Sequence, residues 1–334
     1  MYPILFTIPF IDLPIYSYGV MLGLSLVVGW YLVMRLGRAD GLPGDKMASC
    51  YVWTAVAAMI GARLLYIATN MHEFTSGGLM DLINVRKGGL VAYGGFLGGF
   101  VGSWLYLRRV KIRLLPWADV VVPTLATGLG ITRIGCFLYG CDYGKPIPAD
   151  APGWIKAVGL RFPNWDIHFA GMREKVSDGL TGSLASIEGA PAFQHHVHDH
   201  LISAGAEYSA LVYPTQLMEV ANGWIAFAIL MIARRRTRFR GQIFLIFTAY
   251  YGVTRALMEI IRGDTQRGGI WILSTSQIVG ILTFAAAAVA WYFLSRRAKT
   301  DPEGAMFLGE GAAPPTETEP AKPEVRKIKR KKKK

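Results

Sequence analysis

The sequence predicts an all-α polytopic membrane protein with seven transmembrane helices, and three observations carry this prediction. Of the 334 residues, 52% are hydrophobic and only 18% are charged, and the mean hydropathy is +0.31. Such a composition is typical of integral membrane proteins rather than of soluble domains. Seven apolar runs are each long enough to cross a bilayer. The basic residues between these runs gather in alternate loops.

The apolar runs set the organisation of the chain. Transmembrane helices are expected at 16–34, 47–69, 89–107, 117–139, 215–233, 241–261 and 273–294. The first four belong to residues 1–139 and the last three to residues 214–295. Residues 140–213 are too many for a tight turn, and they are expected to form a small extracytoplasmic cap. Residues 300–334 form a tail.

The charge of the loops predicts the orientation. Fifteen basic residues lie in one alternating set: Arg35, Arg38, Lys46, Arg108, Arg109, Lys111, Arg113, Arg234, Arg235, Arg236, Arg238, Arg240, Arg296, Arg297 and Lys299. The short loops of the other set hold only Arg86, Lys87 and Arg267. By the positive-inside rule the first set is cytoplasmic. The N-terminus is then outside and the C-terminus cytoplasmic.

The cap and the tail each contain a segment that suggests a ligand. The histidine-rich run at 195–200 could bind a metal, but its loop context without a nearby cysteine favours solvated histidines. The tail is rich in Pro, Glu, Thr and Lys, which predicts disorder from residue 300 onward. Its basic block at 326–334 is expected to lie against anionic inner-leaflet lipid, in preference to nucleic acid.

A polar stripe crosses the sixth apolar run. Tyr251, Arg255 and Glu259 are spaced four residues apart and share one helix face, to which Arg262 returns. Each charge at bilayer depth costs about 2.5–3.5 kcal/mol on insertion scales. The stripe is therefore either a helix–helix salt bridge or, as we favour, a polar site inside the membrane.

Two further arginines lie inside apolar runs. Arg133 is near the outer end of the fourth run, and Arg63 is in the second. Together with Arg255 they set three guanidinium groups against one obvious carboxylate, Glu259. This excess of positive charge favours a bound anion. Because arginine grips phosphate in a bidentate manner and stays ionised, a lipid phosphate held towards the outer face is expected.

The third apolar run carries Gly94, Gly98 and Gly102 at four-residue spacing. Small residues at this spacing let two helix backbones approach closely, and packing alone is the favoured interpretation. The alternative is that residues 87–95 form an irregular turn where the backbone reaches a ligand.

Four separated stretches resemble the prolipoprotein diacylglyceryl transferases of bacterial inner membranes. They are the Tyr-Gly motif at 16–21, the glycine-rich segment at 88–95, the signature Arg133-Ile134-Gly135-Cys136-Phe137 with its turn through Gly144, and Tyr213-Pro214-Thr215-Gln216-Leu217-Met218-Glu219. The stripe at Tyr251, Arg255 and Glu259 also fits. The likeness runs in order over about 15–294, apart from the cap.

The sequence departs from the family pattern at several positions. Cys136 stands where the signature has Asn, and Thr132 where it begins with Gly. An acidic residue of the turn is replaced by Cys141, with Asp142 beside it. Two family histidines, where a base would be sought, are Tyr93 and Tyr213. The proton-transfer role therefore does not carry over directly.

The resemblance implies a reaction and its location. The family moves a diacylglyceryl group from phosphatidylglycerol to the lipobox cysteine thiol of a preprolipoprotein that still carries its signal peptide. The products are a thioether and glycerol 1-phosphate, and neither a metal nor another cofactor is required. The protein is expected in the bacterial cytoplasmic (inner) membrane, with its active site towards the outer leaflet.

The expected catalytic residues are Arg133 and Arg255, which would stabilise the leaving phosphate, and Tyr93, which would accept the thiol proton. Glu259 would share that role or only orient Arg255. The expected substrate-binding residues are Tyr18, Arg63, Cys136, Gly140, Gly144, Gln216 and Tyr251. For Arg63 a structural ion pair is an equal alternative, as is helix capping for Gln216. Cys136 and Cys141 are interpreted as small packing residues rather than nucleophiles, and a disulfide between them on the oxidising side stays open.

Two other functions fit part of the sequence. Intramembrane arginine and glutamate also suit a transporter of anionic solutes, although the two halves show no convincing internal repeat. The two tyrosines at family histidine positions also suit a paralogue that binds lipid or lipoprotein without catalysis.

Overall fold

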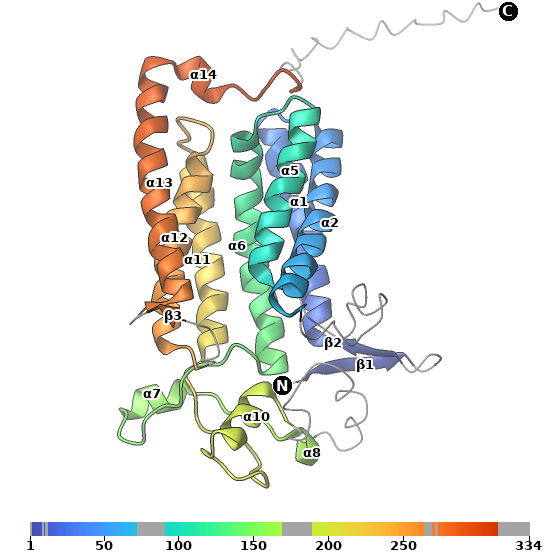
Figure 1. Ribbon diagram of the computed structural model, residues 1–334, viewed down its shortest axis with the longest axis vertical. Coiled ribbons are helices and arrows are strands. Elements are labelled where there is room, and N and C mark those ends of the chain that lie inside the picture. Colours follow the sequence, from blue (N-terminus) through green and yellow to red (C-terminus); the bar gives the residue numbers. More distant parts are fainter. Residues whose placement is uncertain are drawn as a thin grey trace, which may run out of the picture.

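Long helices lie side by side in a bundle, and short elements gather at one of its ends (Figure 1). The computed structural model describes residues 2–8, 10, 13–71, 91–168, 189–263, 269–270 and 273–312. The long helices are α1 (Ser17–Ala39), α2 (Gly44–Thr69), α5 (Ala92–Arg109), α6 (Leu114–Tyr139), α11 (Thr215–Arg234), α12 (Gln242–Ile261) and α13 (Thr275–Thr300). Each corresponds to one apolar run of the sequence, with ends that differ from the prediction by a turn or two at most.

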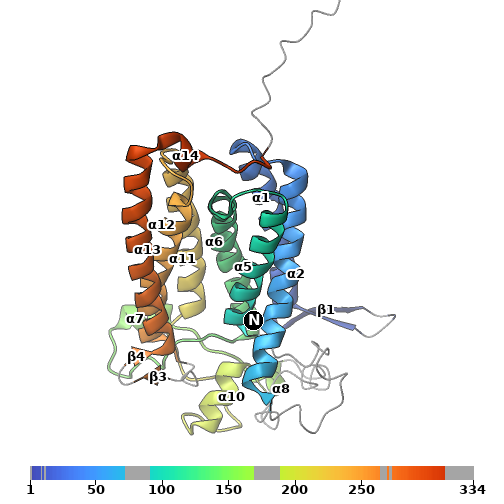
Figure 2. The same cartoon turned by 45° about the horizontal axis from the view of Figure 1, so that its top comes forward.

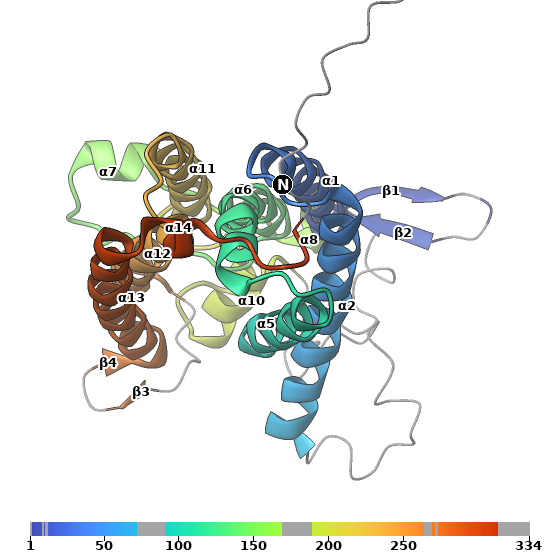
Figure 3. The same ribbon diagram turned by 90° about the horizontal axis from the view of Figure 1, so that it is seen from above.

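The protein is a helical, polytopic membrane protein. Within the described ranges, six helices are long and apolar enough to cross a membrane, and α5 is the long helix outside that set. The glycines of α5 and its terminal Arg108 and Arg109 lower its apolar content. α6 is the most buried of the six. It contacts α1 on one side and α11 and α12 on the other, so it joins the two groups of helices seen end-on in Figure 3.

The glycines of α5 allow close contact with α2. A Cβ atom at Gly94 would overlap the Gly61 carbonyl oxygen, and one at Gly98 would overlap the Ala57 carbonyl oxygen. At Gly102 it would overlap the Ala57 side chain. The packing interpretation of these glycines is therefore confirmed. Residues 87–90 of the alternative turn lie outside the described residues.

Two short hairpins correct the expectation of a purely α-helical fold. β1 (Ile4–Ile8) pairs antiparallel with β2 (Leu13–Tyr16), and β3 (Gly269–Ile270) pairs with β4 (Leu273–Ser274). The first hairpin is anchored because Ile4 is buried in an apolar cluster with residues of the cap. A short hairpin is marginal alone and needs such packing, so its sequence carries little signal.

The cap, residues 140–213, contains α7 (Gly153–Val158), α8 (Trp165–His168) and α10 (Pro191–His198). It has a small apolar core of its own, in which Phe162, Phe193 and Val212 are fully buried. Residues 169–188 of the cap lie outside the described residues.

The expectation of solvated histidines at 195–200 is wrong for two of them. Pro191 starts α10, which turns the run into a helix with one buried face. His196 is 2% exposed, and its Nδ1 accepts a hydrogen bond from the Ala210 amide at 3.2 Å. His195 Nδ1 shares a 2.6 Å hydrogen bond with the Tyr143 hydroxyl. His196 lies three residues after the apolar Phe193, a spacing that puts both on one helix face, and this spacing was the available signal for its burial.

Acidification is expected to loosen the cap through His196. Burial lowers the pKa of His196 in the folded cap. In the unfolded chain histidine has its ordinary pKa of about 6.5 and takes up a proton below that pH, whereas in the folded cap His196 stays neutral to a lower pH. Stability present above that pH is therefore lost as the pH falls. Limited proteolysis between pH 7.5 and 5 should show less pH dependence in His196→Asn than in the wild type. The exposed His198→Asn should behave as wild type; equal pH dependence in all three proteins would contradict this role.

The segment after α13 crosses the end of the bundle opposite the cap (Figure 3). α14 (Pro302–Met306) is capped by Asp301, and the following residues bind the helix-connecting loops. The Arg113 amide donates to the Leu308 carbonyl at 2.8 Å, and Lys46 Nζ donates to the Gly311 carbonyl at 2.7 Å. The disorder expected from residue 300 thus does not extend to residues 300–312, because Leu308 finds apolar partners. Residues 313–334, with the basic block, lie outside the described residues.

Asp119 fastens α12 to α6 at this same end. Its side chain is buried and accepts hydrogen bonds from the Gly241 and Phe244 amides at 2.6 and 2.9 Å. These amides belong to the unsatisfied first turn of α12, so Asp119 acts as its cap from a neighbouring helix.

Asp119→Ala is expected to lower the free energy of unfolding by about 2–3 kcal/mol, because it removes a cap and leaves buried amides unpaired. Thermal unfolding of the purified protein in detergent measures the change. Asp45→Ala, at an exposed site in the first turn of α2, is the matched control. Equal melting temperatures for the two variants would show that the cap contributes nothing.

Candidate active site

The polar residues singled out in the sequence gather at the cap end of the bundle. They lie where α1, α5, α11 and α13 begin and where α6 and α12 end. Because neighbouring helices alternate in direction, these segments meet at one level (Figure 2).

A four-residue ion-pair network lies at this level. Arg133 of α6 is paired with both Asp142 and Glu219. Arg262, which follows the last residue of α12, is paired with Asp142, and its Nη1 lies 3.9 Å from Glu219 Oε1. The network therefore ties the ends of α6 and α12 to the first turns of α11.

Arg255 forms a second, smaller group beside it. Its Nη2 lies 2.8 Å from Glu259 Oε2, one turn later on α12, and donates to Ser276 Oγ of α13 at 3.1 Å. Its Nη1 is buried and has no hydrogen-bond partner within the described ranges. A buried guanidinium N–H without a partner is costly, so this atom is a natural contact for an anionic ligand.

The expectation of excess positive charge overlooked two carboxylates. Besides Glu259, the carboxylates of Asp142 and Glu219 face the guanidinium groups, so the formal charges of Arg133, Arg255 and Arg262 are balanced. The sequence placed Arg262 on the face of the stripe but did not identify Asp142 as its partner, since Asp142 lies in the turn beyond the end of α6. Glu219 had two signals in the sequence: it shares a helix face with Gln216, and it ends the motif at 213–219.

Tyr251 lies in the charge environment of both groups. Its hydroxyl is within electrostatic range of Arg255, Glu219, Arg133 and Tyr93. Tyr18 at the start of α1 interacts in the same way with Arg133 and with the two cysteines of the turn. The structure thus places three of the sequence-predicted tyrosines near the two arginines that the sequence predicts to be catalytic.

The turn after α6 depends on two predicted glycines. Gly140 has φ +89°, and a Cβ there would lie 2.7 Å from Ala190 Cβ. A Cβ at Gly144 would lie 2.5 Å from the Tyr213 carbonyl oxygen. Gly140 is needed for its left-handed backbone and Gly144 for the close approach of the Tyr213 backbone, which supports a positioning role for them.

Gln216 and Thr215 hold this turn from the first residues of α11. Gln216 Nε2 donates to the Cys141 carbonyl, and Thr215 Oγ1 donates to the Asp142 carbonyl, both at 2.8 Å. Gln216 is fully buried, and its Oε1 has no hydrogen-bond partner among the residues described. Gln216 therefore positions Asp142, and through it Arg133.

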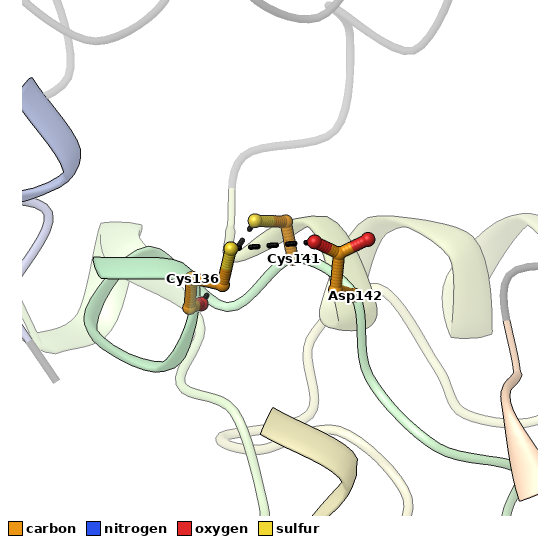
Figure 4. Close-up of side chains that lie close together, drawn as sticks. All are labelled: Cys136, Cys141 and Asp142. Carbon is orange, nitrogen blue, oxygen red and sulfur yellow. Dashed lines mark hydrogen bonds between the residues drawn. The ribbon is translucent and has the colours of Figure 1, made fainter. Parts of the chain in front are cut away.

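Cys136 and Cys141 are free thiols that lie beside Asp142 (Figure 4). Cys136 Sγ donates to Asp142 Oδ2 at 3.3 Å, and Arg133 Nη1 lies 3.7 Å from Cys136 Sγ. Its hydrogen bond with Cys136, and then burial, raise the pKa of Cys141. Cys141 therefore stays protonated and is a poor nucleophile.

The same three residues could be taken for a metal site, since their ligand atoms lie within 4.8 Å of one another. Two guanidinium groups already hold the carboxylate of Asp142. A cation placed there would meet their positive charge, so this donor set does not fit a metal.

An apolar cavity of about 430 Å³ opens beside Tyr251. One face of α6 lines it from Thr132 to Trp117, and Leu22, Leu26 and Phe96 of other helices complete the wall. At 1.5 Å per residue this face is about 22 Å long. We call this cavity, which follows the α6 face, the apolar slot.

Arg63 and Tyr213 are less directly placed. Arg63 is buried in α2, with its guanidinium carbon 5.6 Å from the centroid of the Tyr66 ring. Substrate binding by Arg63 stays a prediction. Tyr213 precedes α11, where its amide donates to the Lys145 carbonyl at 3.1 Å.

Comparison with known proteins gives a consistent result over most of the chain. Residues 3–293 match the family described as prolipoprotein diacylglyceryl transferase. The phosphatidylglycerol–prolipoprotein diacylglyceryl transferase of Clostridium tetani is 28% identical over 284 residues, which cover 85% of this chain and 94% of the relative. A second such protein from Clostridium perfringens is 27% identical over 80% of this chain and 87% of its own length. The protein of this name from Halalkalibacterium halodurans is 25% identical over 85% and 83%.

Proposed function

This chain belongs to the prolipoprotein diacylglyceryl transferase family, and on that premise we propose that it transfers the diacylglyceryl group of phosphatidylglycerol to a prolipoprotein cysteine. The relatives are named for this activity, and their similarity to this chain covers most of their length. We further propose that the acceptor is the lipobox cysteine of a preprolipoprotein still attached to its signal peptide. Glycerol 1-phosphate is then the second product.

Seven helices, including α5, cross the bacterial cytoplasmic membrane in this proposal. Basic residues in the last turns of α1, α5, α11 and α13 support an orientation with the α14 end in the cytoplasm. The N-terminus and the cap are then outside, and the active site opens towards the outer leaflet.

One observation carries the site assignment: Arg255 Nη1 is buried and has no hydrogen-bond partner among the residues described, and the Tyr251 hydroxyl, within electrostatic range of Arg255 and Arg133, belongs to a residue that lines the apolar slot. A phospholipid has this same arrangement of a phosphate joined to acyl chains. The phosphate would lie between the two arginines, with the Tyr251 hydroxyl beside it and an acyl chain in the slot. The carboxylates of Glu219 and Glu259 hold the guanidinium groups in position.

The reaction places its largest change of charge on that phosphate. The acceptor thiol loses its proton, and the thiolate attacks the carbon of the diacylglyceryl group that carries the phosphate ester. The new C–S bond forms as the C–O bond breaks, and the electron pair leaves with the glycerol phosphate. The phosphate thereby gains a negative charge, so fixed guanidinium donors stabilise the transition state more than the bound substrate.

Tyr93 is the residue we assign to accept the thiol proton. It lies in the first turn of α5, is 48% exposed and is within electrostatic range of Tyr251. A membrane-bound peptide can reach this position from the lipid. Glu259 is occupied by Arg255, which favours an orienting role for it.

Tyr93→Phe is expected to lower the rate of transfer about 100-fold, as the loss of a general base does. Tyr93→His should retain much of the activity with a pH optimum shifted to lower pH, because imidazole has a lower pKa than phenol. Tyr31→Phe, at an exposed position of α1, is the control. Wild-type rates in Tyr93→Phe would remove the assignment.

Purified protein in vesicles that contain doubly labelled phosphatidylglycerol tests the function. The transferase moves the acyl label onto a lipobox peptide and releases labelled phosphate as water-soluble glycerol phosphate, in equal amounts. A transporter would move anionic solute and leave the lipid intact, and a non-catalytic binder would do neither. Either of these two outcomes would overturn the proposal.

A further inference from the structure

A second cavity lies at the end of the bundle opposite the active site. Its volume is about 340 Å³, and it is formed between the loop that joins α11 to α12 and the last turns of α13. Its polar and aromatic lining comes from Arg236, Arg238, Gln242, Trp291, Ser295 and Lys299. Figure 1 shows the whole length of the bundle between this loop and the cap.

The loop that supplies both arginines of the cavity has a fixed backbone. Gln242 is 8% exposed. Its Oε1 accepts from the Arg238 amide at 2.8 Å, and its Nε2 donates to the Arg236 carbonyl at 3.4 Å. Both guanidinium groups therefore extend from a preorganised loop at the rim of the cavity.

The wall of the cavity is aromatic. The rings of Phe239 and Trp291 meet edge to face, with their centroids 5.3 Å apart. Phe239 is buried, whereas Trp291 is 38% exposed on α13. Tryptophan at the end of a transmembrane helix is typical of the boundary between membrane and water, which places the cavity at the level of lipid headgroups.

The cations of the cavity differ from the basic residues next to them in the sequence. Arg234 and Arg240 are both paired with Asp40. For Arg236, Arg238 and Lys299, the part of the chain that the structure describes offers no carboxylate within ion-pair distance. Three positive charges around one cavity repel one another, and a bound anion relieves that repulsion.

We propose that this cavity binds the phosphate-bearing headgroup of an anionic phospholipid. Arg236 and Arg238 would bind phosphate oxygens as fork-shaped donors, Lys299 would add a point charge, and Trp291 would pack against the glycerol and upper acyl region. In the orientation proposed above, this lipid belongs to the inner leaflet and is distinct from the donor lipid. The site does not depend on the transferase reaction, and it differs from any lipid contact of the basic tail.

Lipid binding by charge-matched variants tests the proposal. The triple variant Arg236→Gln/Arg238→Gln/Lys299→Gln removes the cavity cations. The control Arg35→Gln/Arg235→Gln/Arg296→Gln removes three exposed basic residues of the same end that do not line the cavity. The purified proteins are titrated in detergent with phosphatidic acid, phosphatidylcholine and glycerol 3-phosphate, and bound molecules are counted by native mass spectrometry. The donor site is intact in both variants, so its binding cancels in the comparison.

The cavity variant is expected to bind phosphatidic acid about tenfold more weakly than the control, since each basic residue near a lipid surface contributes to affinity. Phosphatidylcholine binding and peptide lipidation should be the same in both. Equal affinity of the two variants for phosphatidic acid would overturn the site. Glycerol 3-phosphate that binds as tightly as phosphatidic acid would overturn its assignment to a lipid. Unchanged melting temperatures confirm that the exposed substitutions leave the fold intact.

Discussion

Arg255→Ala is expected to lower diacylglyceryl transfer by at least about 100-fold, and Arg133→Ala by a similar factor. Removal of one fixed donor from a developing oxyanion typically costs about 10²–10³ in rate. The expected loss appears in kcat, because both guanidinium groups are proposed to act on charge that develops as the phosphate leaves. Transfer of labelled diacylglyceryl to a lipobox peptide measures it, with Arg35→Ala as the matched control.

The two arginines differ in how cleanly they can be tested. Arg133 also holds Asp142 and Glu219, so its loss disturbs the ion-pair network and the turn after α6. Arg255 is paired with Glu259 alone among the carboxylates described. The double variant Arg255→Ala/Glu259→Gln removes the carboxylate that would be left unpaired. A folded double variant that transfers at the wild-type rate would show that Arg255 has no part in the chemistry.

Gly98→Ala is expected to destabilise the protein severely, and Gly23→Ala to stabilise it slightly. A Cβ at Gly98 would overlap the Ala57 backbone oxygen of α2, whereas a Cβ at Gly23 would meet nothing within 4 Å. Backbone cannot move aside as a flexible side chain can, so α2 and α5 must separate along their contact. At Gly23 the same substitution gains helix propensity, about 1 kcal/mol.

Melting temperature and yield of the membrane-inserted protein distinguish the two glycine variants. The substitution is identical in both, so hydrophobicity and helix propensity cannot explain a difference. We expect a melting temperature for Gly98→Ala that is several degrees lower than wild type. If the two variants melt together, close contact of α2 and α5 is not what makes Gly98 necessary.

The sequence predicted the helices well because each is specified locally. Length and apolar content define a membrane-spanning helix, and helices form at all seven expected runs. The spacing of Gly94, Gly98 and Gly102 likewise specified a close contact, although it did not name α2 as the partner. The hairpin of β1 and β2 was missed since its stability comes from burial of Ile4 against the distant cap.

The candidate site was predicted in part. Helical periodicity placed Tyr251, Arg255 and Glu259 on one face, and the structure pairs the last two. Periodicity also placed Arg262 on that face, but it says nothing about the turn after α6, so Asp142 was not recognised as the partner of Arg133 and Arg262. The count of intramembrane charges was therefore incomplete. Their balance changes our proposal for the site: the carboxylates orient the arginines, and Arg255 Nη1, which has no hydrogen-bond partner among the described residues, marks the proposed place of the phosphate.

The central claim, that a lipid phosphate lies between Arg133 and Arg255, is tested most directly by an electron cryo-microscopy structure of the protein in a nanodisc of phosphatidylglycerol. The predicted result is headgroup density within hydrogen-bond distance of Arg255 Nη1 and beside Tyr251, with an acyl chain along the α6 face from Thr132 towards Trp117. A slot filled by side chains, with the ordered headgroup bound elsewhere on the bundle, would contradict it.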